Sequence, residues 1–357
     1  MKIKKVIAVF LLCIIFILSV HMFENKVTGK YIKTLEDFPL KYIKKGKALD
    51  FRIDVIINNT ENYLYKSKAI KSKINDQAAL SLISDQKESI TINKDRTYYT
   101  NSNGNAMRLD KDYLSFSTNS ELEKGIESYF SLFPEDHTAN NFMFIDDLKS
   151  LKSLNGKREI ENILHFLGLD NFKLSKSYIL DYKTLQENEK YIDKYGNGNT
   201  NLNRYKSEWT EEDNCEYWIG TETWCGLPVF SGLFSNEISE AWMPIQILYT
   251  KDGIEKLQIL YHFNFEKGTD RIKLKPFEEI ADALERKYSK LLTDNKYLAT
   301  KAELFFWVDI NQEDTKFQMK PVWNFTLKEY RKDSKSDYVE CQEIVDAETA
   351  KILEIGG

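Results

Sequence analysis

The chain has 357 residues, with 50 Lys and Arg against 55 Asp and Glu, which gives a formal net charge of −5 at pH 7. Hydrophobic residues make up 42% and aromatic residues 13% of the sequence, and this composition excludes an intrinsically disordered chain. The slightly acidic balance gives no electrostatic footprint for nucleic acid, so we expect no nucleic-acid partner.

The first predicted element is an apolar run at the N-terminus. Residues 6–23 read VIAVFLLCIIFILSVHMF, follow three lysines and contain only Ser19 and His21 as polar members. The run reaches the lower limit for crossing a bilayer, and no small-residue cleavage site follows it. It therefore predicts an uncleaved transmembrane anchor over residues 1–25, with the N-terminus in the cytoplasm and the bulk of the chain extracytoplasmic. A cleaved signal peptide and a core helix are the alternatives.

Four cysteines bear on the redox chemistry of the chain. Cys13 lies within the apolar run, which leaves Cys215, Cys225 and Cys341 in the part predicted to be exported. An odd number allows at most one internal disulfide. On one straight strand, Cys215 and Cys225 would lie roughly 33 Å apart and could not bridge. Cys341 could pair with either of them, or all three could be small buried residues, and their spacings do not resemble a zinc site.

The region after the anchor, residues 26–145, is predicted to be an N-terminal extracytoplasmic region of stalk, strands and short helices. A lysine-rich stalk precedes an alternating strand near residues 51–57. A short helix is predicted near residues 75–83 and a further strand and turn near residues 88–104.

Residues 146–357 are predicted to form a C-terminal domain, where the periodic patterns are sharper. Ile160 and Leu164 follow helical spacing, and Gly168 suits the left-handed residue that ends a helix. A polar segment over residues 183–214 is predicted to be a long loop.

A hairpin and a helix are predicted further along this domain. Two apolar strands flank the sequence KDG at residues 251–253, which is a hairpin signal. Pro276 suits the first turn of the helix that follows. The apolar stripe of that helix consists of Phe277, Ile280, Ala281, Leu284, Tyr288 and Leu291.

Residues 316–330, KFQMKPVWNFTLKEY, alternate as a strand that carries a proline and a tryptophan close together. Proline cannot donate a hydrogen bond to a sheet, so Pro321 is expected at an edge or a bulge. Trp323 is expected to pack against the helix that contains Phe277 and Ile280. The alternative is an exposed tryptophan beside a free edge that is available to a partner strand.

Three stretches resemble an uncharacterised family of membrane-attached or lipid-attached extracytoplasmic proteins of clostridia, classed as a domain of unknown function. LKPFEEI at residues 274–280 is similar to the family's LLPFEEI-like helix start, and GLPVF at residues 226–230 is similar to another segment. PVWNF at residues 321–325 is similar to a PVWDF-like strand, with Asn324 in the place of Asp. The resemblance covers roughly residues 155–357 and implies a membrane-attached extracytoplasmic protein.

The tail VDAETAKILEI also resembles the closing hairpin of PepSY-type domains, in which a glycine stands at the position of Ala350. If the backbone there is left-handed, alanine costs about 1 kcal/mol. Extracytoplasmic accessory regulators of sensor kinases have a similar plan of an anchor followed by helix-and-sheet units. These resemblances imply PepSY-like helix-plus-sheet units in the C-terminal half.

No pattern in the sequence is typical of an active site or a metal site. His137, His165 and His262 form no zinc motif, and no Gly-x-Ser-x-Gly, dinucleotide-binding or EF-hand sequence is present. We therefore expect no catalytic residue, no cofactor and no metal. The aromatic residues suggest a surface for a partner or ligand, although core packing is the alternative. This candidate surface consists of Trp218, Trp224, Trp307, Pro321 and Trp323.

The predicted elements indicate an α+β fold, with an N-terminal transmembrane helix followed by antiparallel sheets and packed helices. We expect a non-enzymatic envelope protein that binds another envelope protein and has a regulatory or assembly role. The alternative is a binding module for cell-wall glycan or peptide that uses the Trp-rich sheet. A hydrolase is less favoured, because the carboxylates of the strongest helix fit a solvated face.

Overall fold

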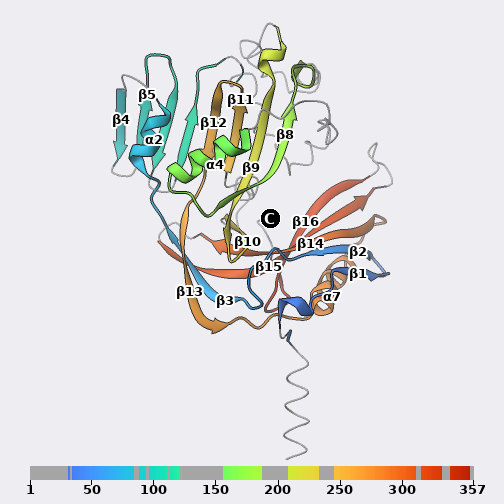
Figure 1. Ribbon diagram of the computed structural model, residues 1–357. Coiled ribbons are helices and arrows are strands. Elements are labelled where there is room, and N and C mark those ends of the chain that lie inside the picture. Colours follow the sequence, from blue (N-terminus) through green and yellow to red (C-terminus); the bar gives the residue numbers. More distant parts are fainter. Residues whose placement is uncertain are drawn as a thin grey trace, which may run out of the picture.

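The computed structural model describes residues 31–32, 34–83, 88–93, 96–110, 113–120, 122, 156–186, 208–232, 245–310, 315–331 and 338–353. The predicted anchor at residues 6–23 lies outside these ranges, and so do residues 187–207 of the predicted loop. The described strands form two sheets with helices on their outer sides (Figure 1).

The upper sheet is entirely antiparallel and is built from strands of both halves of the chain. Its strands, in spatial order, are β4 (Glu88–Asn93), β5 (Arg96–Thr100), β6 (Ala106–Asp110), β7 (Leu114–Ser117), β12 (Gly253–Ile259), β11 (Ile245–Thr250), β9 (Cys215–Trp224) and β8 (Phe172–Leu180). The predicted hairpin around residues 251–253 is confirmed by the pairing of β11 with β12.

The lower sheet is built around a long antiparallel hairpin of β14 (Lys296–Asp309) and β15 (Lys316–Tyr330). Each long strand has two different partners along its outer edge. β14 pairs in parallel with β2 (Leu49–Ile56) and then with β10 (Leu227–Gly232), and β2 in turn pairs with β1 (Lys41–Lys44). β15 pairs with β3 (Tyr65–Lys71) and then with β16 (Val339–Asp346). β13 (Phe263–Arg271) and β17 (Ile352–Leu353) complete the sheet.

Helices cover the outer face of each sheet (Figure 1). α2 (Asp76–Leu82) begins at Asn75, whose side chain accepts a hydrogen bond from the Ala78 N–H at 3.2 Å, as an N-cap does. α4 (Gly156–Phe166) lies beside α2 on the upper sheet, and α7 (Phe277–Tyr288) lies under the lower sheet. Short 3₁₀ turns at Leu35–Asp37 and Glu211–Asp213 connect other elements.

Three hydrophobic cores follow from this layering. The first joins α7 to the lower sheet, and the second joins α2 and α4 to the upper sheet. The third lies between the two sheets, where Phe305, Trp307 and Val322 of the lower sheet meet Tyr217 and Leu248 of the upper sheet. The sheets therefore pack on each other by their inner faces at one end, with the helices outside.

The predicted fold class is wrong. The described chain is dominated by its two sheets, which the pairing of β9 with β10 joins into one large mixed sheet, not by PepSY-like helix-plus-sheet units. Within it, β14 runs parallel to both β2 and β10. None of the helices within the described ranges is long and apolar enough to cross a membrane, so no N-terminal transmembrane helix is shown. The prediction failed because local alternation identifies strands but not their partners: β2 and β14 are about 250 residues apart in the sequence.

Candidate functional site

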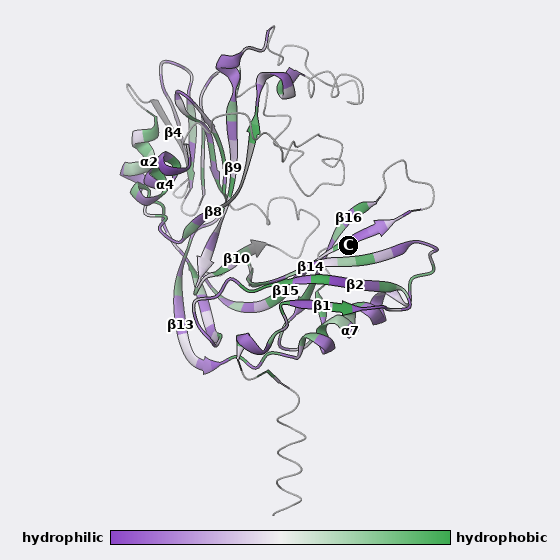
Figure 2. Cartoon of the chain, turned by 45° about the vertical axis from the view of Figure 1, so that its right-hand side comes forward, coloured by the Kyte–Doolittle hydropathy of each residue, from purple (hydrophilic) through white to green (hydrophobic). Residues whose placement is uncertain are grey.

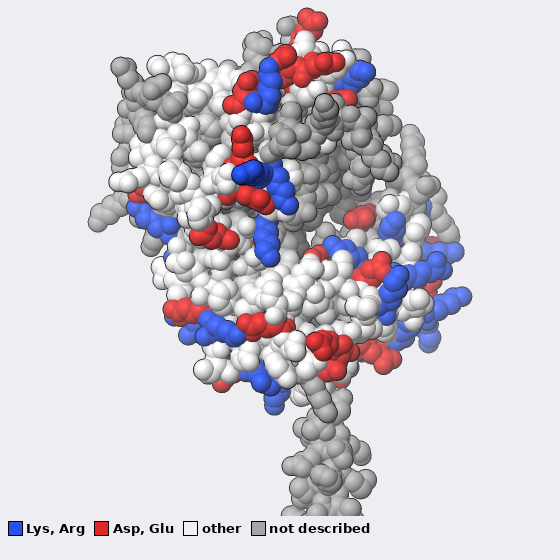
Figure 3. Space-filling view, viewed as in Figure 1, with Lys and Arg blue, Asp and Glu red and all other residues white. Residues whose placement is uncertain are grey.

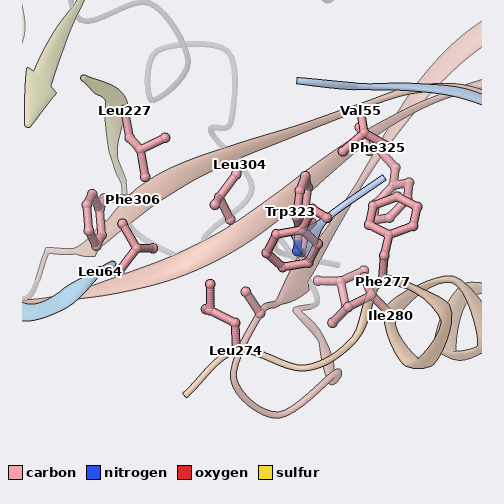
Figure 4. Close-up of a cluster of buried hydrophobic side chains, with 14 of the residues drawn as sticks. Val55, Leu64, Leu227, Leu274, Phe277, Ile280, Leu304, Phe306, Trp323 and Phe325 are labelled. Carbon is pink, nitrogen blue, oxygen red and sulfur yellow. The ribbon is translucent and has the colours of Figure 1, made fainter. Parts of the chain in front are cut away.

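The two tryptophans of the long hairpin are core residues, not surface residues. Trp307 and Trp323 are both fully buried, on opposite faces of the lower sheet. Trp323 makes an edge-on contact with Phe277 of α7, with 5.1 Å between ring centroids (Figure 4). It makes a second edge-on contact with Phe38 at 5.0 Å. The expected packing of Trp323 against α7 is confirmed. The candidate surface must be corrected for both residues, because solvent and partners cannot reach them.

Pro321 lies where the outer partner of β15 changes. β3 pairs with β15 only at Lys316–Gln318, and β16 pairs with it from Val322 onward. The Pro321 carbonyl points to this outer side, since it accepts a hydrogen bond from the Ala347 N–H at 3.0 Å. The missing N–H of proline faces the same side, in the gap between the two partner strands. A proline therefore fits inside this long strand without breaking its pairing with β14.

The other two tryptophans lie apart from the hairpin and from each other. Trp218 is half-buried on the α4 side of β9 and donates from its indole nitrogen to Glu216 at 3.0 Å. Trp224 is half-buried near the opposite end of β9, donates to the Ser67 hydroxyl at 3.2 Å and packs against Phe265. The predicted set of Trp218, Trp224, Trp307, Pro321 and Trp323 is therefore spread over three places and does not form one surface.

Cys215, Cys225 and Cys341 are free thiols in this structure. Burial raises the pKa of the Cys225 and Cys341 thiols to about 11 and also raises the pKa of Cys215. All three therefore remain protonated near neutral pH, where a thiol is a weak nucleophile. Within the described ranges, no three His, Cys, Asp or Glu side chains are grouped as metal ligands would be.

A buried carboxylate and imidazole meet at the junction of the two sheets. His262 Nδ1 lies 2.9 Å from Glu222 Oε1, and the same oxygen accepts a hydrogen bond from the Phe263 N–H at 3.0 Å. The side chains are only 5% and 3% exposed. Phe172 lies opposite Glu222 on the neighbouring strand, and its ring lies 5.9 Å from the imidazole. Burial raises the pKa of Glu222, and His262 partly opposes this effect.

Three chain segments pass between the sheets at this junction. β9 continues into β10, the segment before β13 carries His262, and the segment after β3 contacts it, since the Ser72 N–H donates to the His262 carbonyl at 2.8 Å. A substrate could not reach the Glu222 carboxylate without displacing these segments. The pair is thus placed to hold the two sheets together, and periodicity gave no sign of it because its members are 40 residues apart.

A polar surface lies on the inner face of the lower sheet, beyond the end that the upper sheet covers. Successive side chains of a strand point to opposite faces, so every second residue shares a face. Phe305, Val322 and Ile344 of the intersheet core therefore share the inner face with polar residues two or four positions away on β14, β15 and β16. We define the inner-face site as Lys301, Glu303, Asn324, Thr326 and Gln342. Figure 2 shows purple and green positions mixed along these strands, and Figure 3 shows acidic and basic side chains on this part of the molecule.

The inner-face site contains two amide oxygens without donors. Asn324 Oδ1 and Gln342 Oε1 are shielded from solvent, and neither has a hydrogen-bond partner within the described part of the chain. Asn324 pairs with Ile344 and Gln342 pairs with Thr326, so the two amides lie diagonally across neighbouring strands. Lys301 and Glu303 form an ion pair of 2.7 Å beside them. The site therefore holds two acceptors whose hydrogen-bonding capacity is unused within the described residues. Sequence reasoning missed it because polar residues on alternating strands normally indicate a solvated face.

Fold and surface together define a class of β-rich protein with two stacked sheets, outer helices and a polar inner face. No family model matches the sequence, and no curated protein matches it. Among solved structures, the fold is similar to that of an uncharacterized protein from Eubacterium rectale. The TM-score is 0.61 and the identity 14%, over 93% of this chain and 98% of the other. At this identity the likeness concerns the fold alone.

Proposed function

We propose that the protein is a non-enzymatic extracytoplasmic binding protein, attached to the cell membrane through residues 6–23, that holds an envelope partner on its inner-face site. The location rests on the sequence: an apolar run preceded by lysines and followed by no cleavage site. The resemblance of residues 155–357 to membrane-attached extracytoplasmic proteins supports the same location.

The observation that carries the binding role is the pair of shielded amide oxygens on the inner face. A buried polar atom without a partner costs about 1–3 kcal/mol, so the fold gains nothing from leaving Asn324 Oδ1 and Gln342 Oε1 unpaired. A partner that moves the shielding side chains aside and brings N–H or O–H groups to these two oxygens recovers that free energy on binding. The surrounding Lys301, Glu303 and Thr326 add further polar groups for orientation.

The groups that could serve in catalysis favour a binding role instead. The three thiols have raised pKa values, and the Glu222–His262 pair lies beneath three chain segments. A hydrolase with a paired carboxylate is therefore not supported by the described residues.

A cell-wall glycan or peptide is the second candidate ligand, at the inner-face site and not at a Trp-rich surface. Glycan hydroxyls and peptide amides both donate hydrogen bonds, which is the chemistry that Asn324 and Gln342 lack. Trp307 and Trp323 are not available for stacking on a sugar because both are fully buried.

Position-specific photo-crosslinking tests the proposal. A photoreactive amino acid is placed at Thr326 on the inner face and, as a matched control, at Glu278 on the exposed side of α7. We expect intact cells to give a discrete crosslinked species from position 326 and none from position 278. The double variant Asn324→Leu/Gln342→Leu should abolish that species while the protein stays folded. Equal crosslinking from both positions, or none from position 326 in cells and with cell-wall fragments, would contradict the proposal.

A further inference from the structure

The margin of the lower sheet has a free hydrogen-bonding edge. β1 pairs with β2 on one side, and none of its residues forms a backbone hydrogen bond to any other described strand. The Val55 N–H donates to the Leu40 carbonyl at 3.0 Å, which places residue 40 in a hydrogen-bonded pair with β2. The backbone N–H and C=O groups of successive residues point to alternate edges of a strand. Lys41 and Ile43 therefore direct their N–H and C=O groups away from the sheet. Four backbone groups are thus available to an added strand.

The same edge exposes apolar side chains. Ile43 is 79% exposed and Leu40 is 84% exposed, so both stand out among the large hydrophobic residues of the described chain. Edge strands are usually protected by charged side chains or by coverage, and β1 carries Lys41 and Lys44 but leaves Ile43 exposed between them. Here Tyr42 is the covered residue, packed on Phe51 and Phe277 at the α7 side. Ile43 projects to the opposite side, where no described residue covers it.

Cations surround Ile43 on its own side of the sheet. Lys41 shares its parity, Arg52 lies directly opposite it on β2, and Lys45 is the exposed residue directly after the strand. Lys41 is paired with Asp54 at 3.4 Å, whereas no ion pair joins Lys45 or Arg52 to another described residue. Figure 3 shows Lys and Arg side chains gathered where β1 and β2 lie in Figure 1. The edge therefore presents one apolar position between basic ones.

From these observations we infer that β1 is a docking edge for an extended peptide segment of the pattern acidic-x-apolar-x-acidic, which joins the lower sheet as an extra strand. The apolar residue lies opposite Ile43, and the two acidic residues lie opposite Lys41 and Lys45, because cross-strand neighbours share a face. The backbone groups of Lys41 and Ile43 supply the affinity, and the side-chain pattern supplies the selectivity. This edge lies on the same face of the lower sheet as the inner-face site, with β2 between them, since Asp54 pairs with Lys41 on one side and with Lys301 on the other. The inference therefore extends the proposed binding role to a second contact.

The test uses a fluorescent peptide with the core Glu-Thr-Val-Thr-Glu and measures its binding to the folded protein by anisotropy. Ile43→Pro removes an outward N–H together with the isoleucine side chain, and an edge strand tolerates proline at such a position, so the melting temperature should hold while affinity falls roughly tenfold or more. Ile43→Thr keeps the N–H and removes apolar contact, and it serves if the proline variant fails to fold. Lys45→Glu should weaken binding, and the charge-reversed peptide with Lys in place of Glu should bind weakly to the parent.

The controls separate this inference from the inner-face proposal and from other occupants. Asn324→Leu/Gln342→Leu should leave peptide affinity unchanged, and a peptide of the same composition in scrambled order should bind weakly. Absence of binding to the parent would overturn the inference. So would self-association that Ile43→Pro abolishes, since the occupant would then be a second copy. A third outcome is binding to anionic vesicles that Lys45→Glu weakens and Ile43→Pro leaves unchanged. That outcome would indicate a membrane contact and would also overturn the inference.

Discussion

The two faces of the lower sheet differ although the same strands build both. The face toward α7 is apolar along most of its length, from Phe317 at one end of β15 to Leu327 near the other. The inner face is apolar around Phe305, Trp307, Val322 and Ile344, where the upper sheet covers it, and turns polar farther along β14, β15 and β16. The coverage of each face by a neighbouring layer accounts for the difference, and the polar part of the inner face is where we propose that a ligand binds.

The largest expected loss of stability comes from truncating the two tryptophans that are buried on opposite faces of the lower sheet. Trp323→Ala and Trp307→Ala should each lower the free energy of unfolding by about 3–5 kcal/mol, because each removes a fully buried ring. Urea denaturation measures both values. Trp224→Ala, which removes a half-buried ring, is the matched control and should cost less. A Trp307→Ala variant as stable as the parent would show that the upper sheet does not bury Trp307 on the inner face.

A substitution in the buried Glu222–His262 pair tests whether this pair holds the two sheets together at their junction. Glu222→Gln should destabilise the protein by about 1–3 kcal/mol near pH 5. Because burial raises the pKa of Glu222, the folded protein keeps the proton to higher pH than the unfolded chain does. The contribution of the carboxyl group is thus fully present below its ordinary pKa of about 4.3 and is lost as the pH rises through the raised value. The stability difference between parent and Glu222→Gln should shrink from acidic to neutral pH in urea melts, and growth of the difference with pH would contradict this sign.

The polar end of the α7 face should show a smaller effect. The Tyr288 hydroxyl donates to Glu343 Oε1 at 2.9 Å, and Lys287 pairs with the same carboxylate at 2.7 Å. Tyr288→Phe should cost about 1 kcal/mol, the usual net value of one hydrogen bond. Burial raises the pKa of Tyr288, so the hydroxyl stays a donor and the loss should be the same from about pH 6 to about pH 9. A loss that disappears at the alkaline end would mean that the hydroxyl ionises in the folded protein.

The smallest effect, and the sharpest test of the comparison, concerns the polar part of the inner face. Asn324→Leu removes an amide oxygen that has no partner among the described residues, so stability should rise by about 1 kcal/mol instead of falling. Thermal and urea melts measure the change. Thr326→Val is the control on the same strand and should change stability little. A clear loss of stability in Asn324→Leu would show that the amide serves the fold and not a ligand.

Local sequence determined the elements and much of their packing. Alternation identified the strand over residues 316–330 and the side on which Trp323 is buried, and helical spacing identified α4 and α7. Backbone chemistry was equally local: Gly168 has a φ of 80° after α4, as a helix-ending glycine should. Ala350 has a φ of 56°, so alanine does occupy a left-handed position there. These features depend on neighbours a few residues away, and the sequence contains that information directly.

Tertiary structure alone decided which strands pair and which faces stay open. β14 takes β2 and β10 as parallel partners, and Glu222 meets His262 at the junction, through contacts between distant segments. The predicted Trp-rich surface failed for this reason, since alternation shows that a side chain lies on a face but not whether another layer covers it. Trp307 is fully buried and Asn324 is only half-buried, although both lie on the inner face. Burial depends on the second sheet, and no local pattern in the first sheet records where that second sheet ends.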